Sequence, residues 1–167
     1  MQVRRATTSD VLAMSEIYAH HVLNGTGSFE EEAPTRSMMA QRFAAREADN
    51  HPTLMAILEG EVVGFAYAGH YKPRSAYRFT VENSIYVAAH ATGKGIGVRL
   101  LSELIELCTA MGYRQMIAVI GDSQNSASMA LHARCGFSTV GTAENLGYKH
   151  GRWLDIVYMQ RTLSTTS

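Results

Sequence analysis

The sequence has no excess of either charge, because 15 Lys and Arg residues balance 15 Asp and Glu residues over 167 positions. A chain without a basic surplus has no electrostatic basis for holding nucleic acid or an anionic membrane. It also has no apolar run near the roughly 20 residues of a membrane-spanning helix. The first residues, MQVRRATTSD, lack the apolar core of a secretory signal. These absences predict a cytoplasmic protein that binds neither nucleic acid nor membrane.

Cysteine is scarce, and the histidines form no metal-binding pattern. Cys108 and Cys135 fit neither a disulfide framework nor metal-ligand spacing, so reduced, buried thiols are expected. The histidines, the pair His20 and His21 included, show no ligand spacing and are expected at the surface or in the core. The sequence therefore predicts no metal cofactor.

Apolar periodicity and turn residues predict one α/β domain over residues 1–163, followed by a short polar tail at 164–167. The pair Glu59-Gly60 between two strand-like runs is typical of a hairpin turn. The predicted elements follow in the order β-α-α-β-β-β-α-β-α-β-β. This order is typical of a mixed sheet flanked by helices.

One stretch, VENSIYVAAHATGKGIGVRLL at residues 81–101, joins a strand to an apolar helix through glycines. Gly93, Gly95 and Gly97 occupy alternate positions, and a helix is expected over residues 95–111. Glycine lets main-chain N–H groups approach a ligand closely. The N-terminus of a helix adds unpaired donors and a partial positive charge, so the stretch indicates a phosphate-binding turn.

Two well-known phosphate-binding patterns do not fit this turn. A P-loop needs a hydroxyl residue after Gly-Lys, whereas Gly93-Lys94 is followed by Gly95. A dinucleotide fingerprint needs a third glycine where Val98 stands, in a unit that opens the fold, and this stretch lies mid-chain. From these residues alone, a glycine-rich turn without a ligand stays open as the alternative.

Several motifs together resemble the GCN5-related N-acetyltransferases (GNAT family). TGKGIG after SIYVAAHA is similar to the pyrophosphate loop of that family, although Thr92 stands where Gln or Arg is usual. NSASMALHARCGF is similar to the family's second cofactor element. Within the family, TGSFEEEAPT, YAGHYKPRSAYRFTVENSIYV and GYKHGRWLDIVYMQ resemble the phosphinothricin and methionine sulfoximine acetyltransferases. The resemblance covers residues 1–163.

The resemblance implies a GNAT fold with a mostly antiparallel sheet, acetyl-CoA as co-substrate and a homodimer. The strand around Val87 would bind the pantetheine arm, and the Val87 amide would polarise the thioester carbonyl. Asn125 and Ser128 would reach the arm and the nucleotide. The implied cofactor-binding residues are Ile85, Tyr86, Val87, Gly93, Lys94, Gly95, Ile96, Gly97, Asn125 and Ser128.

Glu82 is the candidate general base. An amine attacks a thioester only as the neutral free base, so a carboxylate must take its proton, directly or through water. Glu82 lies in an apolar strand, where a carboxylate is unusual unless it is paired or catalytic. The resemblance implies the same role, whereas an ion pair with Arg74 or Arg78 is the structural alternative. His132 falls near the place of the thiolate-protonating acid of many relatives, or is a packed helix residue.

An acceptor site is predicted from the segment KPRSAYRF, which leads into the strand of Glu82. The planar guanidinium of arginine binds carboxylates bidentately. The resemblance places Arg74 on the substrate carboxylate, with Tyr77 beside it and Phe29 as a wall of the pocket. Lys72 would meet the polar head group of the substrate side chain.

The predicted activity is direct acetylation of the α-amino group of a small amino acid such as phosphinothricin, methionine sulfoximine or methionine sulfone. No cysteine accompanies Glu82 in its strand as an acyl carrier. Two alternatives stay open. One is an acetyltransferase for another amine, such as a protein N-terminus, and the other is a non-catalytic sensor of acetyl-CoA or an amino acid.

Overall fold

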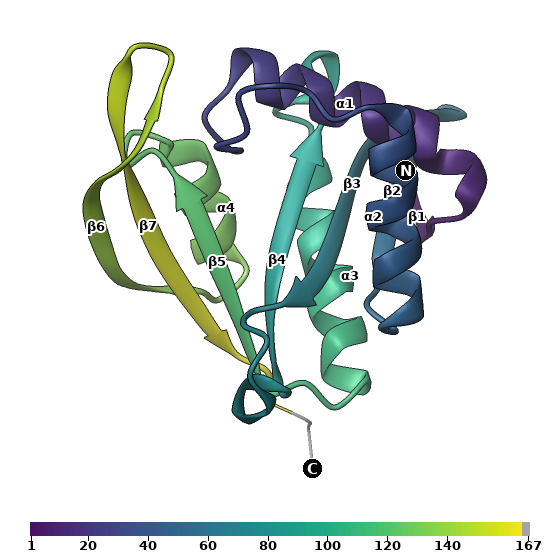
Figure 1. The fold of residues 1–167 in the computed structure, drawn as a ribbon. Helices are drawn as coiled ribbons and strands as arrows, with labels where there is room; N and C mark the ends of the chain where they lie inside the picture. The colour runs from purple at the N-terminus through teal and green to yellow at the C-terminus, as the bar shows by residue number, and fades with distance from the viewer. Residues whose placement is uncertain (165–167) are drawn as a thin grey trace.

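The computed structural model describes residues 1–164, and one seven-stranded sheet runs through them (Figure 1). The elements are β1 (Gln2–Arg5), α1 (Val11–Asn24), α2 (Arg36–Ala48), β2 (Thr53–Leu58), β3 (Glu61–His70), β4 (Thr80–Val87), α3 (Ile96–Ala110), β5 (Gln115–Gly121), α4 (Ser126–Arg134), β6 (Ser138–Lys149) and β7 (Arg152–Thr162). This order of strands and α-helices is the predicted one. Of the predicted polar tail, residues 165–167 lie outside the described part.

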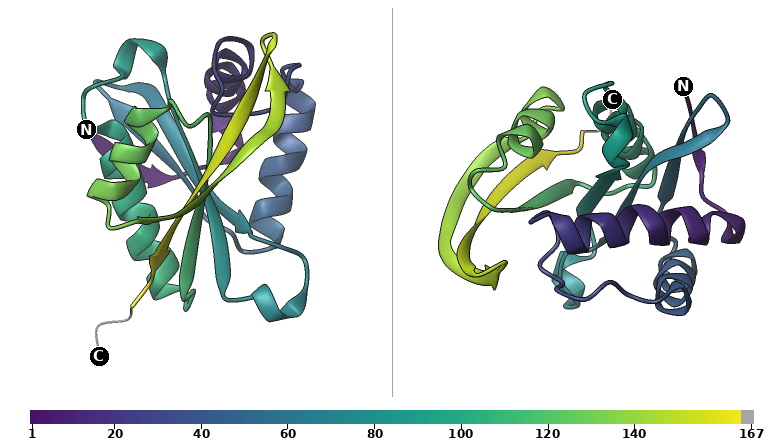
Figure 2. Two further views of the ribbon diagram at one scale, coloured as in Figure 1. Left: turned by 90° about the vertical axis from the view of Figure 1, so that its left-hand side faces the viewer. Right: turned by 90° about the horizontal axis from the view of Figure 1, so that it is seen from above.

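The sheet has the strand order β1-β2-β3-β4-β5-β7-β6, and only β4 and β5 run parallel to each other. Helices α1 and α2 cover one face, and α3 and α4 cover the other (Figure 2). The predicted fold class, a mixed and mostly antiparallel sheet flanked by helices, is confirmed. Among residues 1–164, no helix is both long and apolar enough to cross a membrane.

Local sequence signals explain several element boundaries. Thr35 caps α2, because its hydroxyl oxygen accepts a hydrogen bond from the Met38 amide at 3.1 Å. Glu59 and Gly60 both have positive φ, 53° and 85°, as the tight turn between β2 and β3 requires. Both cysteines, Cys108 and Cys135, are buried and free, as predicted.

The two parallel strands separate in the middle of the sheet. Their pairing runs from Thr80 opposite Gln115 to Asn83 opposite Ala118 and ends there. Residues 84–87 of β4 and 119–121 of β5 therefore do not pair with each other. Backbone N–H and C=O groups along such an opening lack a neighbouring strand and are available to a bound molecule.

Candidate active site

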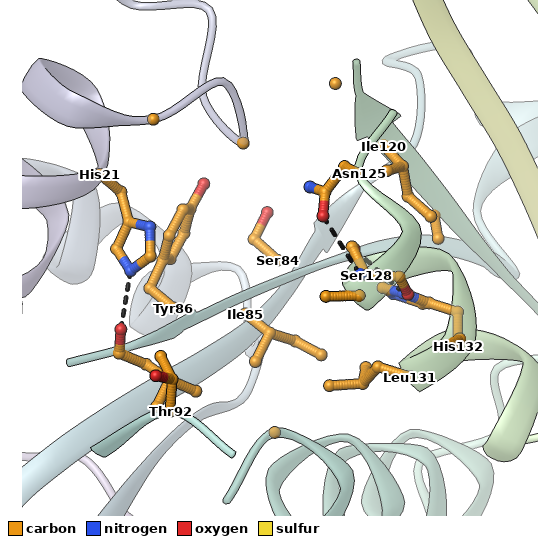
Figure 3. A pocket seen from close by; sticks show the side chains of 18 of the residues that line it. His21, Ser84, Ile85, Tyr86, Thr92, Ile120, Asn125, Ser128, Leu131 and His132 are labelled. Carbon is orange, nitrogen blue, oxygen red and sulfur yellow. Dashed lines mark hydrogen bonds between the residues drawn. The ribbon is translucent and has the colours of Figure 1, made fainter. Parts of the chain in front are cut away.

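A cavity of about 820 Å³ lies where β4 and β5 separate. The diverging strand ends form its floor, the glycine turn before α3 and one side of α4 flank it, and α1 contributes His21 (Figure 3). These segments are distant in sequence. The glycine turn and the α4 motif were predicted to share one ligand, and both line this one cavity.

Nine of the ten predicted cofactor residues line the cavity. They are Ile85, Tyr86, Val87, Gly93, Gly95, Ile96, Gly97, Asn125 and Ser128. Lys94 does not line it, and its side chain is exposed. His132 also contributes to the lining, whereas Glu82, Phe29, Lys72, Arg74 and Tyr77 do not.

Glycine is required at the three positions of the turn for two different physical reasons. Gly93 and Gly95 both have φ of 76°, and the space where their side chains would lie is open. Gly95 is also the N-cap of α3, so the amides at the start of α3 are unpaired within the helix. Gly97 is different, because a Cβ there would overlap the Leu131 side chain of α4. Its lack of a side chain serves the packing of α3 against α4 in addition to any ligand contact.

Replacing Gly95 tests the turn as a phosphate cradle. In Gly95→Val, a branched side chain enters the open space beside the amides, so we expect the KM for acetyl-CoA to rise while the acceptor KM changes little. Steady-state kinetics and calorimetric titration with acetyl-CoA measure this. Gly112→Val is the matched control, since Gly112 also has positive φ (92°) and open space around its Cβ position but does not line the cavity. Unchanged acetyl-CoA binding by folded Gly95→Val would remove the cradle.

The backbone of β4 presents alternate residues to the opening. The Ala88 amide donates to the Val63 carbonyl at 2.8 Å, so Val87 opposite Gly64 is a non-hydrogen-bonded pair with respect to β3. The N–H and C=O groups of Val87 and Ile85 therefore point away from β3, toward the opening. Those of Tyr86 point to β3. Of the three predicted cofactor residues on this strand, Ile85 and Val87 offer backbone groups to the opening, whereas Tyr86 lines the cavity by its side chain (Figure 3).

His21 is a cavity residue that the sequence did not reveal. Its Nε2 lies 2.8 Å from the Val87 carbonyl oxygen and donates to it, while burial lowers the pKa of the ring. The neutral ring thus carries its proton on Nε2 and occupies the Val87 carbonyl. Only the Val87 N–H is left for a ligand. His20 and His21 are adjacent on α1 and have no ligand spacing, so the contact between His21 and Val87 becomes visible only in the folded structure.

The α4 residues form a connected polar group. Asn125 caps α4, its Oδ1 accepting from the Ser128 amide at 3.2 Å. His132 Nδ1 lies 2.8 Å from the Ser128 carbonyl, and Nε2 lies 3.0 Å from Asn83 Oδ1 on β4. Both ring nitrogens face oxygen atoms of the protein, and burial lowers the pKa of the ring, so the neutral ring donates to only one of these two oxygens. The geometry favours the structural interpretation, in which His132 joins α4 to β4.

Glu82 faces the opposite side of the sheet from α3. Along β4 it shares a face with Ser84 and Tyr86, and Tyr86 packs edge-on against Tyr18 of α1. Burial raises the pKa of the Glu82 carboxyl, with no other cause contributing. Within residues 1–164, its carboxylate makes no ion pair or hydrogen bond, so the expected alternative of a salt bridge to Arg74 or Arg78 is absent. An unpaired, desolvated carboxylate suits proton abstraction.

Phe29 lies over the same face as Glu82, in the loop between α1 and α2. A Cβ on Gly121 of β5 would come within 2.7 Å of Phe29 Cε1, and one on Gly147 of β6 would come within 3.0 Å of its Cζ. Gly121 shares the face of Ile117, which is the β5 neighbour of Glu82. Two glycines on two strands thus make room for this ring, which suits the predicted wall.

Filling one of these spaces should displace Phe29. Gly147 lies in β6 and its own φ is not positive, so Gly147→Val keeps the backbone allowed, but the new side chain overlaps the ring. We expect the acceptor KM to rise by roughly 10- to 100-fold, because a misplaced wall disturbs substrate alignment. The KM for acetyl-CoA should not change. Gly141→Val, on the same strand with open space around Gly141, is the control. Equal kinetics of the two variants would contradict a wall at Phe29.

The segment with Lys72, Arg74 and Tyr77 projects to the side of the sheet that carries α2 (Figure 2). All three are exposed, and Lys72 lies over the Tyr71 and Tyr77 rings at 5.3 and 5.7 Å. Within the described chain, the Arg74 guanidinium has no hydrogen-bond or ion-pair partner. The structure brings this segment to the face of Glu82 but does not bring Arg74 into contact with Glu82 or Phe29.

Comparisons with known proteins agree with this geometry. The sequence profile of the Acetyltransferase (GNAT) family matches residues 15–137. The chain belongs to this family. The predicted enzyme class, an N-acetyltransferase, is thereby confirmed.

Two relatives and one solved structure belong to the predicted subgroup. The phosphinothricin N-acetyltransferase of Alcaligenes faecalis is 49% identical over 97% of this chain and 82% of its own length. An L-methionine sulfoximine/L-methionine sulfone acetyltransferase of Pseudomonas paraeruginosa is 39% identical over 98% of this chain and 95% of its own length. A Sinorhizobium meliloti phosphinothricin acetyltransferase, solved in complex with AcCoA, superposes with a TM-score of 0.95 at 47% identity. The match covers 98% of this chain and 88% of that chain.

Proposed function

We propose that residues 1–163 form a single acetyltransferase domain that transfers the acetyl group of acetyl-CoA to the α-amino group of a small amino acid. Phosphinothricin, methionine sulfoximine and methionine sulfone are the proposed acceptors, as the names of the relatives suggest. The observation that carries the proposal is the separation of β4 and β5, with free amides on one side of the sheet and a desolvated carboxylate on the other.

The cavity fits the chemical parts of acetyl-CoA. The amides of the glycine turn, from Gly93 to Gly97, would hold the pyrophosphate at the N-terminus of α3. The backbone of Ile85 would bind the pantetheine arm as an added strand does. The side-chain NH2 of Asn125 is free of protein partners within residues 1–164 and would donate to the arm or nucleotide. When bound, acetyl-CoA supplies an activated acyl group.

The reaction would need two groups of the protein. The Glu82 carboxylate takes a proton from the acceptor ammonium, and the resulting neutral amine attacks the thioester carbonyl carbon. A C–N bond forms and the C–S bond breaks. The nitrogen gives up its second proton to the departing CoA sulfur, directly or through water, so that the amide and free CoA thiol are the products. The Val87 N–H donates to the carbonyl oxygen as its negative charge grows. Because His132 is engaged by Asn83 and Ser128, no protein acid is assigned to the thiolate, whose ordinary pKa of about 8.5 makes it a tolerable leaving group.

The acceptor would lie on the face of Glu82. Phe29 forms one wall, and the free guanidinium of Arg74 binds the substrate carboxylate. Lys72 and Tyr77, which lie beside each other, meet the polar head group. The homodimer and the cytoplasmic location stay predictions of the resemblance and of the composition.

A panel of acceptors tests this function directly. The enzyme is incubated with acetyl-CoA and each candidate acceptor, and release of free thiol is followed. Fast thiol release with methionine sulfoximine or phosphinothricin, and slow release with methionine, would support the proposal. Preference for an N-terminal peptide would favour the alternative acetyltransferase, and absence of any turnover despite acetyl-CoA binding would favour a sensor.

A further inference from the structure

Three potential metal ligands come together at the end of the sheet away from the cavity. Asp49 and His51 follow α2, and His70 is the last residue of β3. His70 pairs with Val81 of β4, at the opposite end of that strand from Val87. One ligand atom from each of Asp49, His51 and His70 lies within 4.8 Å of the others.

The β2–β3 hairpin produces this arrangement. Thr53 pairs with Tyr67, and the Ala68 amide donates to the Pro52 carbonyl at 3.1 Å, so the residues before β2 lie alongside the end of β3. The two histidine rings meet edge to face, with their centroids 4.3 Å apart. Nineteen positions in the sequence separate these histidines, which is why ligand spacing did not reveal them.

Besides the clustering of the three side chains, the surroundings of His51 also point to a bound metal ion. Only 3% of this residue is exposed, yet neither ring nitrogen is hydrogen-bonded to another group within residues 1–164. Tyr113, which follows α3, stacks on the other side of the ring at 6.1 Å. A ring that is held by packing and whose nitrogens have no protein partner within residues 1–164 is available as a preformed metal ligand.

The charges around the cluster are mixed. Asp49 supplies a carboxylate, whose Oδ2 lies 3.6 Å from His70 Nε2. The positive charge of Arg46 would repel a bound cation, but its guanidinium is held over the Tyr67 ring at 4.0 Å and donates a hydrogen bond to Thr53.

We propose that Asp49, His51 and His70 bind a divalent transition metal, with Zn²⁺ as the best-suited ion and water in the remaining position. Two imidazoles and one carboxylate are a common zinc donor set. Ligand atoms in a tetrahedral zinc site lie roughly 3.3 Å apart, given bonds of about 2.0–2.1 Å. The exposed side chains of Asp49 and His70 can close this gap around the fixed His51. The metal would tie the end of β3, where the Arg74 segment begins, to the turn after α2.

Metal titration of the untagged, chelator-treated full chain tests the site. Zn²⁺ is titrated against a chromophoric chelator, and Co²⁺ is used for its visible spectrum. We expect one Zn²⁺ per chain, a tetrahedral Co²⁺ spectrum and a higher Tm with Zn²⁺. His70→Gln and Asp49→Asn, both at side chains more than half exposed, should fold normally and weaken binding by at least roughly 10- to 100-fold.

His90→Gln is the matched control. His90 is as exposed as His70 and also has one acidic neighbour, Glu61 at 3.2 Å, but no second histidine. It should bind Zn²⁺ as the unmodified chain does. The site is overturned if the unmodified chain binds no Zn²⁺, if His90→Gln weakens binding as much as His70→Gln, or if the Co²⁺ spectrum is the same in His70→Gln.

Discussion

Glu82→Gln should lower kcat by about 10²–10⁴ with the affinity for acetyl-CoA preserved. The amide keeps the shape of the side chain but cannot accept the proton of the acceptor ammonium. Because Glu82 does not line the cavity, the substitution leaves the cofactor contacts intact. Stopped assays of thiol release give kcat, and calorimetry gives acetyl-CoA binding. Glu106→Gln, on the exposed side of α3, is the control and should keep full activity.

The pH dependence of the unmodified enzyme and of Glu82→Gln provides a second test of Glu82 as the base. Burial raises the pKa of Glu82, so the carboxylate is protonated, and kcat/KM falls, at a higher pH than for an exposed glutamate. In Glu82→Gln this fall of kcat/KM toward acidic pH should disappear. The remaining activity should rise with pH, because more of the acceptor amine is then neutral. Near-full turnover of Glu82→Gln at pH 7 would make Glu82 structural, and the base would have to be another group.

Local signals were sufficient for the elements and for the glycine turn. The turn at Glu59-Gly60 depends on neighbouring residues only and is found as predicted. The cap of α2 at Thr35 is equally local. The same holds for α3, predicted over 95–111 and found as Ile96–Ala110. Helix and turn chemistry is encoded within a few residues, so a single sequence is enough to read it.

Contacts between distant segments were not predictable in this way. The register of β3 against β4 decides that Val87, and not Tyr86, presents its amide to the opening. The contact of His21 with Val87 joins residues 66 positions apart. Likewise, Gly97 faces Leu131 only because α3 packs on α4. Each of these depends on how whole elements dock, and a pattern within one segment contains no record of that.

The acceptor segment shows a different limit of the sequence. Its composition predicted a carboxylate-binding group, and the structure leaves the Arg74 guanidinium free of partners within the described residues, as a ligand-binding group must be. Composition does not show how far Arg74 must move to reach a substrate near Glu82. Exposed side chains in a segment between two strands can move at low cost, so substrate binding would order this segment.

Arg74→Ala should raise the KM for methionine sulfoximine or phosphinothricin by about 10- to 100-fold, the expected loss for hydrogen bonds to a charged group. The guanidinium binds the substrate carboxylate, so an amine acceptor without a carboxylate should be almost unaffected by the substitution. The KM for acetyl-CoA should also stay the same, since Arg74 lies outside the cavity. Parallel thiol-release assays with both acceptors measure the ratio of the two effects.

Arg78→Ala is the matched control for this ratio. Arg78 lies in the same segment with the same charge, but its guanidinium donates to the Ser75 carbonyl at 3.1 Å and lies over the Phe79 ring at 4.6 Å. Loss of Arg78 therefore removes one positive charge from the segment without removing the free guanidinium. If both variants weaken amino-acid acceptors equally, the segment attracts the substrate only through its charge. If Arg74→Ala instead slows the carboxylate-free amine as much as the amino acids, Arg74 does not bind the carboxylate. The proposed substrate class would then lose its recognition group, while the acetyltransferase fold and the cofactor site would be unaffected.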